Sequence, residues 1–136
     1  MRAVVQRVSR ARVVVDGAEV GAIGAGLVVF LGVDRADDET DVEYMAGKIA
    51  GLRIFADAED RMNLSLTQRG GEALVVSQFT LMADCRKGRR PGFSRAAPGQ
   101  MALALYEAVV ERLSSMGVKV ATGVFQADMQ VDLSND

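Results

Sequence analysis

The chain has 136 residues, of which 49% are apolar and 25% charged, and its formal net charge is −2. This length and balance fit one soluble domain with one core and are too apolar for a disordered chain. A net negative charge excludes a protein that binds polyanions with its whole surface. Because the chain contains no histidine, Ser-His-Asp and Cys-His catalysis are excluded, and we expect neither a metal nor a cofactor.

The sequence also predicts where the protein works. Its longest apolar stretch, Gly26 to Val33, is too short to span a bilayer, and the first residues do not have the form of a signal peptide. Cys85 is the single cysteine and cannot form an internal disulfide, which favours a reducing compartment. We therefore expect a cytoplasmic protein without a membrane-spanning segment.

The first quarter of the chain has the pattern of β-strands. Two β-branched runs within residues 3–15 predict two short strands, and Asp16-Gly17 is a hairpin signal that leads into a third strand at 18–23. Residues 27–33 form a continuous apolar run. Such a run predicts a central strand that is covered on both faces.

Two main helices are expected after these strands. The first follows the acidic turn at 34–38, where Thr40 and Glu43 fit a capping box, although an aspartate of that turn could cap the helix instead. The second begins near Pro98, and Gly117 is well placed to end it.

The remaining apolar runs complete the predicted sheet. Strands are expected at residues 73–81, 118–125 and 129–133, and no linker or internal repeat divides the chain. The prediction is therefore one α+β domain, residues 1–136, with helices packed against a curled, mostly antiparallel, barrel-like sheet.

The most informative segment is SQFTL, residues 77–81, at the end of an apolar run. If it continues the strand, Ser77 and Phe79 share one face while Gln78 and Thr80 share the other, so neither face is apolar. Their hydroxyl and amide groups could hold a substrate, and a strand with a solvated polar face is the competing interpretation. A serine or threonine nucleophile would need a base, so positioning and backbone N–H donors are favoured over covalent catalysis.

A second unusual segment is the basic loop, which we define as residues 86–90. It places four cations in five positions: Arg86, Lys87, Arg89 and Arg90. It is the only concentrated positive patch of the chain, and phosphate is its natural partner. A solvated charged face is the alternative interpretation.

Taken together, these segments resemble the D-aminoacyl-tRNA deacylase (D-tyrosyl-tRNA deacylase) family. Residues 1–8, 26–32, SQFTL, 86–93, 96–98 and 122–125 fall in the order of that family over essentially the whole chain. The resemblance implies a homodimer that hydrolyses the ester joining a D-amino acid, or glycine mischarged on tRNA(Ala), to the 3′ end of tRNA.

The resemblance also assigns residues to the site by position. It implies three groups: a catalytic pocket for the terminal adenosine and aminoacyl group, the walls of that pocket, and contacts to the tRNA backbone. The catalytic pocket would contain Ser77, Gln78, Phe79 and Thr80. Its walls would contain Ala96, Phe125 and Met129, and the contacts to the tRNA backbone would come from Arg86, Lys87, Arg89 and Arg90.

One family motif is incomplete in this chain. The motif reads Asn-x-Gly-Pro-x-Thr, and only its first two residues are present, as Asn135 and Asp136. In the family the Gly-Pro pair, which has a cis bond, enters the partner's pocket, captures the substrate's amino group and excludes L-residues. Two alternatives follow: either the motif continues beyond Asp136, or the chain ends there and the resemblance does not extend to chiral selection and activity.

The absence of histidine suggests a mechanism for such a site. An aminoacyl ester is already activated and its neighbouring ribose hydroxyl can assist, so backbone N–H groups near Phe79 and Thr80 could stabilise the oxyanion. Ser77 and Gln78 would then orient the ribose and adenine. A rival hypothesis makes the Thr80 hydroxyl the nucleophile.

Two other functional classes stay open on the sequence. One is a non-catalytic tRNA-binding module that uses the basic loop, with salt-sensitive binding and no ester cleavage. The other is a small-molecule-binding α+β oligomer without affinity for tRNA.

Overall fold

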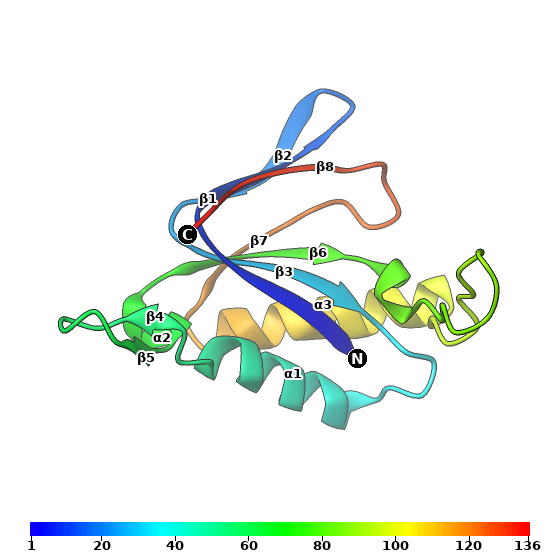
Figure 1. Ribbon diagram of the computed structural model, residues 1–136, viewed down its shortest axis with the longest axis horizontal. Coiled ribbons are helices and arrows are strands. Elements are labelled where there is room, and N and C mark those ends of the chain that lie inside the picture. The colour runs from blue at the N-terminus through cyan, green and yellow to red at the C-terminus, as the bar shows by residue number, and fades with distance from the viewer.

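The computed structural model describes residues 1–136 and folds them into a curled sheet that has two long helices on one face (Figure 1). In chain order the elements are β1 (Arg2–Val15), β2 (Ala18–Ile23), β3 (Gly26–Gly32), α1 (Glu39–Gly51), β4 (Phe55–Ala56), β5 (Met62–Leu64), α2 (Leu66–Arg69), β6 (Glu72–Ser77), the 3₁₀ helix η1 (Phe79–Met82), α3 (Gly99–Ser115), β7 (Lys119–Thr122) and β8 (Gln130–Asn135).

The long strand β1 pairs with three other strands. Its first half runs antiparallel to β3, and its second half runs antiparallel to β2 and to β8. The two strands predicted within residues 3–15 are therefore one strand. The polar residues Ser9 and Arg10 did not end it because both are exposed to solvent; the pairing with β8 shifts its register there instead.

The sheet is mixed: the three pairings of β1 are antiparallel, as expected, but two further pairings are parallel, which was not predicted. Strand β3 pairs in parallel with β6, and β6 pairs in parallel with β7. The cause lies in the connections: α1 follows β3 and α3 follows β6, and a chain that crosses over through a helix returns to the same end of the sheet. The curl itself is confirmed, because β8 returns to pair with β1.

The side chains of β3 alternate between two apolar cores. Leu27, Val29 and Leu31 face α1 and α3, which pack side by side beneath the sheet (Figure 1). Val28 belongs to a second core that the curled sheet encloses together with Val8, Val13 and Leu74. This two-sided burial confirms the prediction of a covered central strand.

The SQFTL segment is not a strand. The last pair between β3 and β6 joins Leu31 to Ser77, and β3 ends one residue later at Gly32. Without a partner strand the chain turns: Gln78 N–H still donates to Leu31 O over 2.8 Å, and Phe79 begins η1. The predicted division of the segment into two strand faces is therefore wrong beyond Ser77.

The two main helices are confirmed, with changes at their ends. Asp38 caps α1 and forms a capping box with Asp41, so an aspartate of the acidic turn replaces Thr40 as the cap. Helix α3 starts directly after Pro98, and Gly117 follows it with φ +84°. None of the helices is both long and apolar enough to cross a membrane.

Residues 118–125 and 129–133 were predicted as whole strands, but only parts of them pair. Strand β7 stops at Thr122, because the chain then leaves β6 to form one wall of a pocket. The final strand β8 is displaced toward the end of the chain and reaches Asn135, because its pairing with β1 extends to Val8.

A glycine substitution tests the contact between β3 and β6. A Cβ added at Gly26 would lie 1.9 Å from the carbonyl oxygen of Glu72, whereas one added at Gly24 would meet nothing within 4 Å. We expect Gly26→Ala to lower the free energy of unfolding by about 3 kcal/mol, because the clash is with backbone. The matched control Gly24→Ala should change it by less than about 0.5 kcal/mol. Urea denaturation measures both, and equal stabilities would contradict this close approach.

Candidate functional site

A cavity of about 550 Å³ lies where the parallel strands β3 and β6 end. Leu31 and Val33 line it from the end of β3, and Val76 and Ser77 from the end of β6. Most of its lining is apolar, and no histidine, cysteine or carboxylate is among the lining residues. The cavity therefore provides shape and a few polar groups, which is the usual composition of a small-ligand pocket.

The pocket brings together six of the seven residues that the sequence predicts for the catalytic pocket and its walls. Its lining residues include three from SQFTL and all three predicted wall residues: Ser77, Gln78, Phe79, Ala96, Phe125 and Met129. Segments far apart along the chain thus meet at one cavity.

Thr80 is the one member of SQFT that does not line the pocket. It is exposed, and its hydroxyl accepts a hydrogen bond from the side-chain amide of Gln78. The hydroxyl therefore orients an amide that does line the cavity.

The start of η1 presents two free backbone donors beside the cavity. Leu81 N–H donates to Gln78 O and Ala83 N–H to Thr80 O, whereas Phe79 N–H and Thr80 N–H have no backbone acceptor. The first N–H groups of any helix are left unpaired in this way. Adjacent N–H groups at a pocket edge are the arrangement that stabilises an oxyanion.

The basic loop lies outside the pocket lining but is attached to the pocket edge. Asp84 and Gly92 exchange two backbone hydrogen bonds, of 2.7 and 3.0 Å, at the base of the loop. Just beyond the loop, Phe93 packs edge-on against Phe79, with ring centroids 5.0 Å apart. The loop projects at the end of the molecule where α3 begins (Figure 1).

The four cations of the basic loop are not equivalent. Arg86 is paired with Asp84, and its guanidinium holds the pKa of that carboxyl well below the usual range. Lys87, Arg89 and Arg90 are exposed and form no ion pair within the chain. Three cations thus remain free to meet an anionic partner.

The motif remnant at the end of the chain does not line the pocket. Asn135 ends β8 and accepts a hydrogen bond from Gln6 Nε2 over 2.7 Å. Asp136 forms an ion pair with Arg7, with Nε and Oδ2 3.1 Å apart. Both residues are held against β1.

Tyr106 on α3 is a pocket residue that the sequence identified only as part of a helical core stripe. Its hydroxyl donates to Val75 O over 2.8 Å, and burial, assisted by the nearby Glu107, raises its pKa to about 12. The group is therefore neutral at ordinary pH and cannot act as a base. Its ring lies 6.0 Å from that of Phe125, so it supports the pocket wall.

Small residues next to the predicted wall were also missed. Ala97, Gly99 and Ala102 line the pocket around the start of α3. Their side chains carry no chemical signal, and only their succession close to Pro98 could have marked a space near the helix start.

A second hollow on the outside of β1, β2 and β8 is a weaker candidate. Three of its four charged side chains satisfy one another, since Arg12 is paired with Asp132 over 2.9 Å and faces Glu19 at 3.9 Å. The fourth, Arg10, donates to Ser134 Oγ over 3.2 Å. No group of three or more histidine, cysteine, aspartate or glutamate side chains is placed to hold a metal ion.

The fold and the pocket define a class of protein: a small α+β domain whose site offers backbone donors, an amide and a hydroxyl in an apolar cavity. The chain belongs to the D-Tyr-tRNA(Tyr) deacylase family, whose sequence profile matches residues 4–136. The resemblance recognised in the sequence is thereby confirmed.

Individual relatives agree with this assignment. The chain is 62% identical over 136 residues to the D-aminoacyl-tRNA deacylase of Anaeromyxobacter dehalogenans and 59% identical to that of Heliobacterium modesticaldum. In both comparisons the match covers 100% of this chain and 91% of the relative.

Solved structures share the fold. The c-Myc DNA Unwinding Element Binding Protein superposes with a TM-score of 0.94 at 39% identity, covering 100% of this chain and 93% of that one. A probable eukaryotic D-amino acid tRNA deacylase gives a TM-score of 0.83 at 17% identity, with 98% and 93% covered, which is a likeness of fold.

Proposed function

We propose that the protein is a D-aminoacyl-tRNA deacylase, which hydrolyses the ester between a D-amino acid and the 3′ end of tRNA. The observation that carries the proposal is the pocket itself. It gathers Ser77, Gln78 and Phe79 with the three predicted wall residues, beside two free N–H groups. Two relatives that are 62% and 59% identical bear the name of this activity.

The proposed mechanism relies on the backbone and on the substrate. Water attacks the ester carbonyl, and the N–H groups of Phe79 and Thr80 stabilise the oxyanion that forms. One such donor accounts for about 10²–10³ in rate in a well-studied hydrolase. The neighbouring ribose hydroxyl assists proton transfer to the departing 3′ oxygen. This scheme needs no imidazole, in agreement with a chain that lacks histidine.

Substrate selection follows from the size of the pocket and from its missing charges. No carboxylate lines the cavity, so the substrate's ammonium group has no acidic partner within this chain's pocket. In our proposal the protein is a homodimer in which the Gly-Pro pair of the partner's continuation beyond residue 136 takes that role and excludes L-residues. Small wall residues leave room for glycine, and we extend the proposal to glycyl-tRNA(Ala).

The tRNA itself is the partner proposed for the basic loop. Lys87, Arg89 and Arg90 would meet its phosphates, and Phe93 connects this loop to the pocket edge through Phe79. The cytoplasm, where aminoacyl-tRNA is used, is the expected compartment. Free cations would equally suit the second candidate function, a tRNA-binding module without catalysis.

Matched D- and L-tyrosyl-tRNA test the proposed activity. We expect a protein extended through the Gly-Pro motif to deacylate the D-substrate at least about 100-fold faster, equivalent to about 2.7 kcal/mol, because the L-side chain would collide with a rigid wall. Release of labelled tyrosine measures both rates for the extended protein and for residues 1–136. Equal rates by the extended protein would refute the proposal, and salt-sensitive binding without cleavage would favour the binding module.

The role of Thr80 separates the two mechanisms. Thr80→Ala removes the hydroxyl but leaves the backbone N–H in place, so we expect turnover to fall by less than about tenfold. Thr80→Ser serves as the control that restores the hydroxyl. If Thr80→Ala abolishes single-turnover cleavage while tRNA binding is retained, the hydroxyl is the nucleophile and the backbone mechanism is wrong.

Charge removal tests the basic loop. The double variant Arg89→Ala/Arg90→Ala should weaken tRNA binding and reduce the slope of log affinity against log salt by about 2, since two phosphate contacts are lost. Arg61→Ala/Arg69→Ala, in exposed positions around β5 and α2 at the other end of the molecule, is the charge-matched control (Figure 1). Filter binding over a range of salt concentrations measures the slopes. Identical slopes for the two double variants would remove the loop from the tRNA interface.

A further inference from the structure

One wall of the pocket has no regular structure of its own. Ala96 and Ala97 line the cavity from the connection between the basic loop and α3. Two backbone hydrogen bonds attach this connection to the turn after β3: Ala97 N–H donates to Val33 O over 3.0 Å, and Arg35 N–H donates to Arg95 O over 2.9 Å. The position of the wall therefore depends on that turn.

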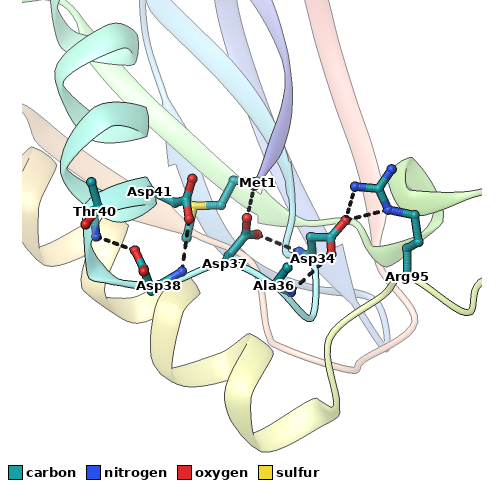
Figure 2. Close-up of polar contacts among 8 residues, drawn as sticks. All are labelled: Met1, Asp34, Ala36, Asp37, Asp38, Thr40, Asp41 and Arg95. Carbon is teal, nitrogen blue, oxygen red and sulfur yellow. Dashed lines mark hydrogen bonds and ion pairs between the residues drawn. The ribbon is translucent and has the colours of Figure 1, made fainter.

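An ion pair reinforces this attachment. Arg95 Nε donates to Asp34 Oδ2 over 2.8 Å, and a second guanidinium nitrogen lies 2.6 Å from the same oxygen (Figure 2). The other carboxylate oxygen accepts Ala36 N–H over 3.1 Å. The pair joins residues 61 positions apart in the sequence, one in the turn after β3 and one directly before the Ala96–Ala97 wall.

Asp34 is unusual because it is a buried charge. Its side chain is 8% exposed, close to the 7% of Asp37, and Asp34 is the one charged residue that is buried as a whole. The Ala36 N–H lowers its pKa against the opposing effect of burial, and Arg95 lowers it further. A buried carboxylate needs such partners, because an unpaired charge away from water is costly.

Asp37 fixes the same turn from the other side. Its Oδ2 accepts Asp34 N–H over 2.6 Å, and its Oδ1 forms an ion pair with the α-ammonium group of Met1 (Figure 2). The turn is thus attached both to the start of β1 and, through Asp34, to the pocket wall. The contacts of Asp38 with Thr40 and Asp41 are separate and only cap α1.

We propose that Asp34 and Arg95 are positioning residues of the substrate pocket, which set the distance between the Ala96–Ala97 wall and the strand ends that form the pocket floor. Neither residue lines the cavity, so both act through the wall. The proposal rests on the proposed function, because it concerns how the aminoacyl group is held for ester cleavage. Reacting groups misplaced by about 1 Å can cost about 10²-fold in rate.

A role in stability alone does not account for the pair. The Arg95 side chain is 65% exposed, so water screens the pair from the arginine side and lowers what the attraction itself adds to stability. The guanidinium adds a third attachment to a wall segment that two backbone hydrogen bonds join to the turn. Removal of both charges together should leave the protein folded and change the pocket.

The test uses four variants and one control in the extended protein. They are Asp34→Asn, Arg95→Gln, the double variant Asp34→Asn/Arg95→Gln, the conservative Arg95→Lys, and Asp38→Asn as the control. The control makes the same chemical change in the same turn but touches only the cap of α1. Readouts are kcat and KM for D-tyrosyl-tRNA, affinity for uncharged tRNA, and hydrogen exchange at the Ala97 amide.

If the proposal is right, Asp34→Asn and Arg95→Gln each lower kcat/KM by about tenfold, and the double variant is no worse than either, because the pair acts as a unit. Arg95→Lys recovers part of the loss. Exchange at the Ala97 amide becomes faster in both single variants. Asp38→Asn matches the wild-type protein in kcat/KM and in exchange at Ala97, and the affinity for uncharged tRNA does not change.

Two results would overturn the proposal: single variants that match Asp38→Asn in kcat/KM, or Ala97 exchange that does not change. The double variant leaves no buried charge without a partner, so it gives a folded protein even where Arg95→Gln, which strands the Asp34 carboxylate, does not. A wild-type protein that cleaves no D-tyrosyl-tRNA would refute the proposed function instead. The exchange measurement then decides the positioning role by itself.

Discussion

The parallel pairing of β3 with β6 is the contact on which the rest of the molecule depends. It places one apolar core on each face of β3, one under the helices and one inside the curl of the sheet. It also makes two strands end at the same edge, with Leu31 opposite Ser77 as the last pair. Beyond that edge the two segments diverge, into the turn at Asp34 and into η1, and the pocket occupies the space between them.

This ending of the sheet also explains the chemistry that the site offers. When β6 loses its partner, the chain turns into a short helix, and the N–H groups of Phe79 and Thr80 are left without acceptors. Polar residues in SQFTL are therefore tolerated because the segment has left the buried ladder. A pocket without carboxylate, cysteine or histidine can act on an ester through such donors and through the substrate's own hydroxyl.

Local patterns in the sequence predicted what local forces decide. The apolar run at β3, both main helices and the hairpin at Asp16-Gly17, where both residues have positive φ, were all predictable from neighbouring residues. The parallel pairing was not, because it depends on which end of the sheet each crossover returns to. SQFTL was predicted as a strand because its own residues do not show that the partner strand β3 ends at Gly32. The pocket residues were recovered through the family resemblance, and the small residues at the start of α3 had no signal of their own.

The acidic turn shows how residues of one type in one short segment can differ in role. The sequence predicted a helix cap there, and Asp38, which is exposed, does cap α1 together with the half-buried Asp41. Asp34 is instead buried and paired with a residue 61 positions away, which no local pattern could predict. A site that works by positioning, with no acid–base group of its own, depends on the placement of its walls. In the proposed mechanism, residues that never touch the substrate then contribute to the rate, and we propose that this chain places them in the turn that follows the central strand.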